Sequence, residues 1–488
     1  MKVALSRKNL WDKTPYWLKS TVGRSCSLVP PAWFLGRTFR DNCRFVAQAQ
    51  WWPAERARQY QLARLRDILQ LAYEKTVFYR GAFDTVGFQP GDLRSVADMG
   101  RLPTIDKQVV NDHLADMCTR SVNGRDVDMG STGGTSGAPL RFYLDTHRSF
   151  IEYAYLTGGW TRVGYRLGMP MAVLRGRRVG IDRNGLRHEY DPILRQHFYS
   201  NVHMTAESMT SYVEHMRTIG TCVFHAYPSS AHTLARHILT TAVPSPGNVK
   251  AVLLQSENVY SDQIEDIETA FRSRVFSSYG HSEKLVLADQ CEHTRHYHVW
   301  PTYGYCELLD EEGNPVTVPG QRGEIVGTGF INTIVPFIRY RTGDWATYGG
   351  EGCAACGREH VILTEIRGRW PQGELLAGDG AIITTTTLNV HDDTFRKVQD
   401  YQFQQSVPGK VTLWIVPSEP IDAQEQQRIV AHLNKRLQGQ VVFDIALRME
   451  LVKTARGKQP RVIQQCRGLS GTWTGGRSEA ARKCRMDS

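Results

Sequence analysis

The chain has 488 residues, 41% of them hydrophobic, and a formal net charge of +10. This length allows a large core in more than one domain, and no apolar run approaches the roughly 20 residues that cross a bilayer. The opening residues lack a signal-peptide hydrophobic region and the basic residues are spread along the chain. We therefore expect a cytoplasmic protein with at most peripheral membrane contact and no specific nucleic-acid partner.

Residues 1 to 50 show no clear hydrophobic period, and we expect an irregular N-terminal extension there. A helix is predicted from Pro53, because apolar side chains then recur on one helical face. These are Leu62, Leu65, Ile68, Leu69 and Ala72. Strand and helix patterns alternate from there to about residue 367, which is typical of an α/β domain.

A small-residue loop precedes the alternating segment 140–144. Its glycines free the backbone to turn toward a ligand, and its hydroxyls suit phosphate. The candidate nucleotide contacts are Thr132, Gly133, Gly134, Thr135, Ser136 and Gly137. No Gly-Lys-Ser/Thr closes the loop, so it is not the phosphate loop of ordinary P-loop ATPases. An ordinary surface turn is the alternative.

Two distant segments share one design, a strand followed by a turn and a carboxylate. Residues 274–283 contain Tyr279 and Glu283, and residues 339–344 end on Asp344. An aromatic ring can stack on adenine, one carboxylate can hold magnesium, and the other can accept hydrogen bonds from ribose. Together with the loop, these residues predict a site for ATP and Mg²⁺.

In order and spacing, these motifs resemble those of the adenylate-forming superfamily. The loop 132–139 resembles its phosphate loop, residues 278–283 its Tyr-Gly-x-Ser/Thr-Glu motif, and residues 342–344 its Thr-Gly-Asp motif. The chain is most similar to the phenylacetate-CoA ligase-like branch, which includes proteins of capsular polysaccharide biosynthesis. The resemblance runs from about residue 50 to about 465 and rests also on 77–80, 102–107, 256–257, 336–341 and 356–358.

The resemblance implies a large multi-sheet adenylation domain over 51–367 and a small mobile α+β domain over 368–466. In the small domain, residues 411–416 predict a strand, and residues 422–438 predict a helix with an Asp422/Glu425 capping box and Gly439 as its stop. A second strand is predicted from Val441. Residues 467–488 are basic and poor in apolar groups, and we expect a disordered tail.

The resemblance also implies roles for single residues. Lys458 would swing toward the large domain as the catalytic lysine, and Glu283 would hold Mg²⁺. The nucleotide would be contacted by Ser256, Glu257, Ser278, Tyr279, Gly280, Asp344 and Arg369. Residues 227–230 resemble a segment that faces the acyl pocket, whereas we interpret His225 as a satisfied, partly buried histidine.

Two positions depart from the family pattern. Pro371 stands near the position of the usual domain hinge, and its fixed φ would restrict rotation there. Ala138 replaces a common lysine of the phosphate loop. The restricted rotation at Pro371 would affect the second half reaction, transfer to an acceptor, more than the first, activation of the acid.

Cys353 and Cys356 have the spacing of a metal chelate, and Cys291 and His298 lie just beyond the adenine motif. The four could bind a structural zinc ion, as some relatives of this branch do. His293 and His296 compete as nitrogen ligands, and free thiols in a glycine-rich turn are the alternative. The basic cluster 175–178 is either a solvated face or a site for an anionic substrate.

The resemblance implies ATP-dependent activation of a small carboxylic acid to an acyl-adenylate, followed by transfer to an acceptor. Coenzyme A is the expected acceptor, and an amine or a sugar hydroxyl is the alternative within the same class. A zinc-containing nucleic-acid-binding protein and an inactive nucleotide-binding scaffold are alternatives from other classes. Neither the acid nor the oligomeric state follows from these residues.

Overall fold

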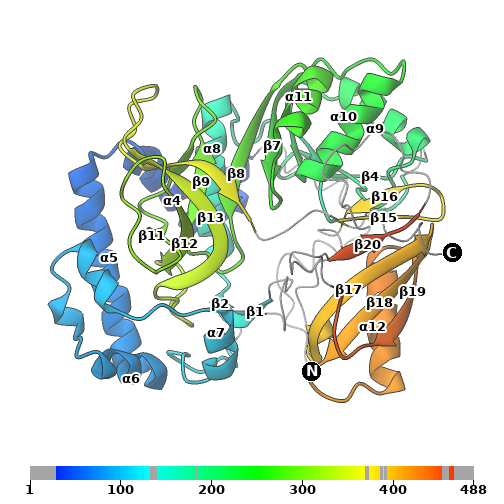
Figure 1. Ribbon diagram of the computed structural model, residues 1–488. Helices are drawn as coiled ribbons and strands as arrows, with labels where there is room; N and C mark the ends of the chain where they lie inside the picture. The colour runs from blue at the N-terminus through cyan, green and yellow to red at the C-terminus, as the bar shows by residue number, and fades with distance from the viewer. Residues whose placement is uncertain are drawn as a thin grey trace, which may run out of the picture. The chain divides into compact units, whose positions relative to one another are not determined.

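The computed structural model describes residues 29–124, 126–131, 140–177, 179–182, 185–368, 373–384, 388, 393–452 and 461–466. The chain forms two compact units (Figure 1). Of the described residues, the large unit contains those up to 368 except 202–205, and the small unit contains 202–205 and those from 373 onward. The α/β fold expected from the sequence is confirmed.

Within the described residues, twelve strands form the main sheet of the large unit. In spatial order the strands are β11 (Gly304–Leu309), β12 (Arg322–Gly329), β13 (Tyr340–Glu351), β14 (Val361–Arg367), β10 (Tyr297–Val299), β9 (Leu287–Gln290), β8 (Arg274–Gly280), β7 (Val249–Gln255), β6 (Cys222–Ala226), β3 (Met171–Leu174), β5 (Gln196–Tyr199) and β4 (His188–Asp191). The five neighbouring strands from β8 to β5 run parallel, and the other strands pair antiparallel.

Helices pack on both the parallel and the antiparallel part of the large unit. Helix α11 packs against β7 and β8 and lies beside α10, whereas α8 packs against β8 and β9 (Figure 1). The helices of this unit are α3 (Pro31–Phe34), α4 (Gly36–Ala49), α5 (Ala54–Lys75), α6 (Val77–Thr85), α7 (Lys107–His113), α8 (Arg148–Trp160), α9 (Ala206–Thr218), α10 (Pro228–Thr240) and α11 (Ser261–Phe271), with short 3₁₀ turns at Pro90–Asp92, Val96–Arg101 and Thr161–Val163. A separate hairpin joins β1 (Val127–Ser131) to β2 (Arg141–Asp145). No helix in the described part of the chain is both long and apolar enough to cross a bilayer.

The helix predicted from Pro53 is confirmed as α5, which buries Leu65, Ile68, Leu69 and Ala72. The expectation of an irregular segment up to residue 50 was wrong for residues 36–49, which form α4. That helix buries only Phe39, Val46 and Ala49 among many polar residues, so its period is hard to recognise in the sequence. Val46 packs in a cluster with Tyr155, Trp300 and Tyr303.

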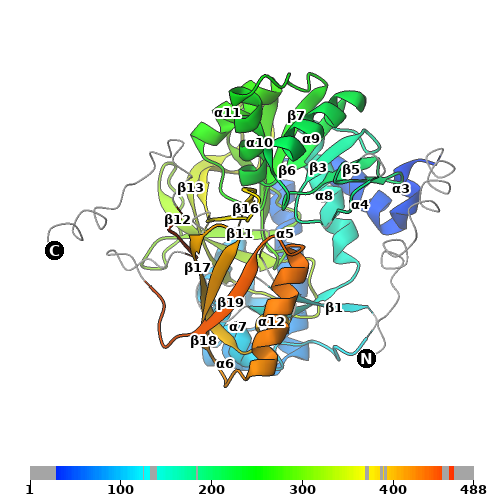
Figure 2. The same cartoon turned by 90° about the vertical axis from the view of Figure 1, so that its right-hand side faces the viewer.

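The small unit has a four-stranded sheet in the order β19 (Val442–Leu447), β18 (Lys410–Pro417), β17 (Val398–Val407), β20 (Val462–Gln464). Helix α12 (Ala423–Arg436) packs against β19 (Figure 2). It contributes Ile429 and Leu433 to the core of the unit. The Asp422 side chain accepts a hydrogen bond from Glu425 N at 2.8 Å, and Gly439 has φ +77°, so the predicted start and stop signals are confirmed. The unit also contains β15 (Glu374–Leu376), β16 (Ile382–Thr384) and a 3₁₀ turn at Asp393–Phe395.

Candidate active site

A pocket of about 340 Å³ opens in the large unit, at the carboxyl ends of parallel strands. Tyr153 and Trp160 of α8 line it together with Phe198 of β5 and with His225 and Gln255, which belong to β6 and β7. Ligands of open α/β sheets bind in this kind of crevice, beyond the carboxyl ends of the strands. The wall combines aromatic surface with a few polar groups, as small-molecule sites do.

Arg175 is the central polar group of this pocket. It donates hydrogen bonds to Gln255 Oε1 at 3.1 Å and to Ser256 Oγ at 2.8 Å, and it contacts His225 Nε2. Its guanidinium lies 5.0 Å from the centre of the Tyr227 ring. Arg175 is half-buried and lines the pocket, and none of these four partners carries a carboxylate.

His225 is buried, as we expected from the sequence. Burial, reinforced by the positive charge of Arg175, holds the pKa of His225 well below its usual value. The ring is therefore neutral, and its Nε2 accepts from Arg175. His225 also contacts Trp160, with ring centroids 5.0 Å apart, so it contributes to the pocket wall as well as to packing.

Residues 256–258 lead from the pocket toward the predicted nucleotide motifs. Ser256 has φ +74°, a backbone conformation that is strained for a residue with a side chain. Glu257 accepts hydrogen bonds from Ser229 N at 2.8 Å and Ser229 Oγ at 2.9 Å, in the first turn of α10. A carboxylate at this place satisfies an otherwise unpaired helical N–H group and complements the helix dipole.

Two motifs predicted to contact the nucleotide lie side by side. Tyr279 at the end of β8 donates from its hydroxyl to Asp344 Oδ2 at 3.0 Å. Burial raises the pKa of Tyr279 well above its usual value, and the neighbouring Asp344 adds to this effect, so the phenol remains a donor. Asp344 is itself 8% exposed. The hydrogen bond fixes the orientation of the carboxylate beside the tyrosine ring.

Asn258 brings the end of β14 to the same place. Its Oδ1 accepts from Gly368 N at 2.8 Å, and its Nδ2 donates to Gly368 O at 3.3 Å. A Cβ atom on Gly368 would lie 3.5 Å from Asp344 Oδ1, so these three residues are neighbours. Asn258 follows the predicted Ser256-Glu257 pair directly, but no sequence signal distinguished it.

The sequence suggested that Asp344 follows a turn at the end of a strand, and this expectation was wrong. Residues 342–344 lie inside β13, and Gly343 has φ +73°. The pairing of β13 with β12 shifts register opposite these residues, so the motif is a β-bulge. The glycine permits the bulge, because residues with a Cβ rarely adopt this φ. The bulge re-aims Asp344 without ending the strand.

Glu283 is 2% exposed and lies just beyond β8. Tyr340 donates from its hydroxyl to Glu283 Oε1 at 3.4 Å, and His281 Nδ1 lies 3.4 Å from Glu283 Oε2. Ser278 and Gly280 belong to β8, where Ser278 is buried. The predicted residues Thr132, Gly133, Gly134, Thr135, Ser136, Gly137, Arg369 and Lys458, as well as Ala138 and Pro371, lie outside the described residues.

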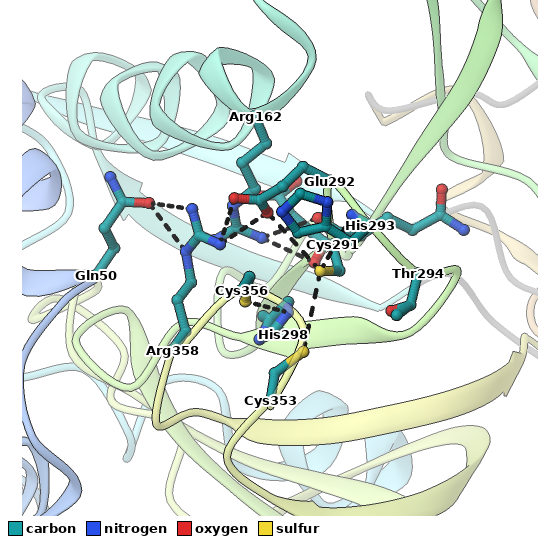
Figure 3. Close-up of polar contacts among 12 residues, drawn as sticks. Gln50, Arg162, Cys291, Glu292, His293, Thr294, His298, Cys353, Cys356 and Arg358 are labelled. Atoms are coloured by element: carbon teal, nitrogen blue, oxygen red, sulfur yellow. Dashed lines mark hydrogen bonds and ion pairs between the residues drawn. The ribbon is translucent and has the colours of Figure 1, made fainter.

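The four residues expected to form a metal site are brought together in the large unit (Figure 3). One potential ligand atom from each of Cys291, His298, Cys353 and Cys356 lies within 4.8 Å of the others. The Cys291 and Cys353 sulfurs are 4.0 Å apart, and Cys356 Sγ lies 3.5 Å from His298 Nε2. Cys291 follows β9, His298 belongs to β10, and the two other cysteines lie between β13 and β14.

These distances agree with the edges of a tetrahedral zinc site. Zinc lies about 2.3 Å from sulfur and about 2.0 Å from nitrogen, which places two sulfurs about 3.8 Å apart and sulfur and nitrogen about 3.5 Å apart. Burial is the main cause that lowers the pKa of His298, to about 3, so the imidazole is neutral and can ligate a metal. Its competitors His293 and His296 do not belong to this cluster.

An arginine holds the loop that carries two of the cysteines. Arg358 donates to both carboxylate oxygens of Glu292, at 2.9 and 2.7 Å, and to Gln50 Oε1 at 3.1 Å (Figure 3). Gly357 N donates to Cys353 O, and Gly357 has φ +78°, which closes the turn between the two cysteines. The ion pair and the turn both restrain the loop that carries Cys353 and Cys356.

No family model matches the chain. Over 321 residues it is 23% identical to a phenylacetate-coenzyme A ligase from Thermus thermophilus, and the match covers 65% of this chain and 71% of that protein. Over 340 residues it is 24% identical to the protein CapK from Staphylococcus aureus, covering 68% and 72%.

Among solved structures, a 2-hydroxyisobutyryl-CoA ligase in the postadenylation state has a TM-score of 0.54 and 19% identity, covering 85% of this chain and 91% of that one. The same ligase in its thioesterification state, in complex with 2-HIB-AMP and CoA, also has a TM-score of 0.54, at 20% identity, covering 86% and 92%. The chain is thus similar in sequence to phenylacetate-coenzyme A ligases and to CapK, and it has the fold of 2-hydroxyisobutyryl-CoA ligase.

Proposed function

We propose that the protein is an adenylate-forming acid–CoA ligase. It joins a carboxylic acid to the α-phosphate of ATP, releases pyrophosphate, and transfers the acyl group from AMP to the thiol of coenzyme A. The observation that carries this proposal is the meeting of Tyr279 of β8, Asp344 of β13 and Gly368, which follows β14, on the pocket-bearing sheet. Relatives that are acid–CoA ligases support the same activity.

In this proposal ATP is held by residues of four segments. The ring of Tyr279 stacks on the adenine, and Asp344 accepts from the ribose hydroxyls. The loop residues 132–137 contact the phosphates, Arg369 adds positive charge, and Glu283 holds Mg²⁺. The Mg²⁺ ion held by Glu283 would stabilise the negative charge of the pyrophosphate leaving group.

The acid occupies the pocket of the large unit, with its carboxylate toward Arg175. The hydrogen-bond partners of this guanidinium named above are all non-acidic, so an anion there gains a charge-assisted hydrogen bond. Tyr153, Trp160 and Phe198 supply apolar surface for the body of the acid. This wall favours an acid with an aromatic or alicyclic body over a long unbranched chain.

Lys458 supplies the charge that adenylation requires. The attack of one anion on another builds negative charge at the α-phosphate, and an ammonium group stabilises that charge most when it is present only in the transition state. A lysine on a separate unit can act in the first half reaction and be absent from the second, in which the thiol attacks.

The cysteine–histidine cluster binds one zinc ion as a structural site. Three sulfurs and one nitrogen form a closed shell with no position for a substrate, and their spacing supports this assignment. The ion would tie the loop 353–356 to the β9–β10 hairpin. Its contribution is to stability and not to the reaction.

Product analysis tests the function directly. The full chain is incubated with ATP, Mg²⁺, coenzyme A and a panel of aryl, alicyclic and fatty acids, and the products are identified by mass spectrometry. We expect an acyl-CoA and equal amounts of AMP and pyrophosphate for at least one acid. Formation of ADP and phosphate, or of acyl-AMP without any thioester, would contradict the proposed reaction or its acceptor, respectively.

A further inference from the structure

Three histidines meet at the β4 edge of the main sheet, outside the site described above. His188 belongs to β4, His197 to β5 and His215 to α9. One ring nitrogen from each lies within 4.8 Å of the other two. All three belong to the large unit and are half-buried.

The hairpin register explains why the two strand histidines meet. His188 lies opposite Tyr199, and Tyr190 lies opposite His197, in the antiparallel pairing of β4 with β5. Opposite residues and residues two apart share one face of a sheet, so both histidines point to the same side. Helix α9 brings His215 to that side, with its ring centroid 4.3 Å from that of His188 and 5.5 Å from that of His197.

The ring nitrogens have the spacing of metal ligands. His188 Nε2 lies 3.1 Å from His197 Nδ1. Two imidazole nitrogens on one tetrahedral zinc, each about 2.0 Å from the metal, lie about 3.3 Å apart. The observed contact is close to this edge, and the third ring is within reach of the same centre.

The outer nitrogens have partners that would orient the rings. Tyr199 Oη lies 2.7 Å from His215 Nδ1, so Nε2 is the nitrogen of that ring left to bind a metal. His188 Nδ1 lies 3.8 Å from Asp182 Oδ2, on the other side of the ring from Nε2. Metal-bound histidines almost always place the second ring nitrogen against such an oxygen, which fixes the tautomer and the ring orientation.

We propose that His188, His197 and His215 bind a divalent transition-metal ion of the zinc class. Three imidazoles suit Zn²⁺, Co²⁺, Ni²⁺ and Cu²⁺ and not the oxygen-seeking Mg²⁺ or Ca²⁺. The site is independent of the cysteine–histidine cluster and of the proposed ligase reaction. With three protein ligands it keeps one position for water, unlike the closed cysteine shell.

The site has a consequence for the pocket. Gln196 and Phe198 flank His197 in β5, point to the opposite face of the sheet and line the pocket. An ion that ties β4 and β5 to α9 would therefore stiffen one wall of that pocket. Without an ion, the same three rings form a hydrogen-bonded stack, which is the competing explanation of the cluster.

Metal counting on tag-free full-length protein tests the site. Chelator-treated protein is titrated with Zn²⁺ alone, and bound metal is measured by elemental analysis and calorimetry. His197→Gln is compared with wild type and with His232→Gln, in which the lost histidine pairs with Asp266 on another helix. We expect His197→Gln to bind about one equivalent less than wild type and His232→Gln to bind the same amount.

Co²⁺ titration of the Cys353→Ser/Cys356→Ser variant gives a second readout. Binding with ligand-field bands and no sulfur charge-transfer band would identify an all-nitrogen site, and His215→Gln in this background should abolish it. Circular dichroism checks that each variant folds. If His197→Gln or the Cys353→Ser/Cys356→Ser variant does not fold, the metal content of His188→Gln is compared with that of wild type instead. Equal metal content in wild type and the folded histidine variants would overturn the proposal and leave the hydrogen-bonded stack.

Discussion

At the scale of single residues, the hydrogen bond from Tyr279 to Asp344 belongs to the nucleotide site that we propose. Asp344→Ala removes an acceptor for the ribose hydroxyls, and a hydrogen bond to a charged group contributes about 1.5–3 kcal/mol. We expect the KM for ATP to rise roughly tenfold or more, with a smaller rise for Tyr279→Phe, which keeps the ring. Steady-state kinetics in ATP with saturating acid measure this. Wild-type KM in both variants would remove these residues from the ATP site.

Arg175 provides the second prediction at this scale. Arg175→Gln removes the positive charge of the pocket wall but keeps a hydrogen-bond donor, so we expect the KM for the acid to rise about tenfold or more while the KM for ATP changes little. Arg175→Lys is the matched control, because it restores the charge without the planar fork, and it should recover part of the affinity. A rise confined to the KM for ATP would place the acid elsewhere.

At the scale of elements, substitution of Glu257 distinguishes a structural role of its carboxylate in helix α10 from a role in nucleotide binding. The carboxylate accepts two hydrogen bonds from Ser229 in the first turn of α10. Glu257→Ala should therefore lower the free energy of unfolding by about 1 kcal/mol, the usual cost of a lost helix cap. Chemical denaturation measures this. A large rise in the KM for ATP at unchanged stability would instead favour the direct nucleotide contact that the family resemblance implies.

The loop between β13 and β14 carries the zinc prediction. Cys353→Ser should lose about one equivalent of zinc and melt at a lower temperature, because the bound ion contributes folding free energy. Cys118→Ser, which changes a cysteine outside the cluster, should keep both. Elemental analysis and thermal unfolding with and without chelator distinguish the two variants. Wild-type protein that contains no zinc, when prepared without chelator, would remove this site.

The sequence predicted those elements whose local signals agree with their packing. Helix α5 has a clear apolar period, and α12 begins at Asp422 and stops at Gly439. Helix α4 was not predicted because only three of its residues are buried. The bulge at Gly343 was not predicted because it depends on the register between strands β12 and β13. The sequence shows the local chemistry of an element, but it does not show which strands pair with each other.

The same limit applies to the sites. Tyr279, Asp344 and the cysteine–histidine cluster could be predicted because they fall in recognisable motifs or have chelate spacing. Asn258 could not, because its importance comes from what the fold places beside it. Arg175 fell in a basic cluster with two possible interpretations, and only the fold places it in the wall of a pocket. The three histidines have no regular spacing in the sequence, and only the hairpin register and helix α9 bring them together.

At the scale of the whole molecule, Lys458 tests whether the small unit acts in one half reaction only. Lys458→Ala should slow adenylate formation by on the order of 100-fold or more while ATP and acid still bind. Transfer from a supplied acyl-adenylate to coenzyme A should change much less. Pro371, near the position of the usual hinge, makes the comparison informative. Equal losses in both steps would reject the separate use of the lysine.

The central claim is that the protein makes an acyl-adenylate, and acid-dependent ATP–pyrophosphate exchange measures this step without any acceptor. The account predicts exchange that requires both Mg²⁺ and a cognate acid. The exchange should be strongly reduced in Asp344→Ala and Lys458→Ala and retained in His232→Gln. ATP binding without pyrophosphate exchange for any acid in a broad aryl, alicyclic and fatty panel would contradict the account and leave a nucleotide-binding scaffold in its place.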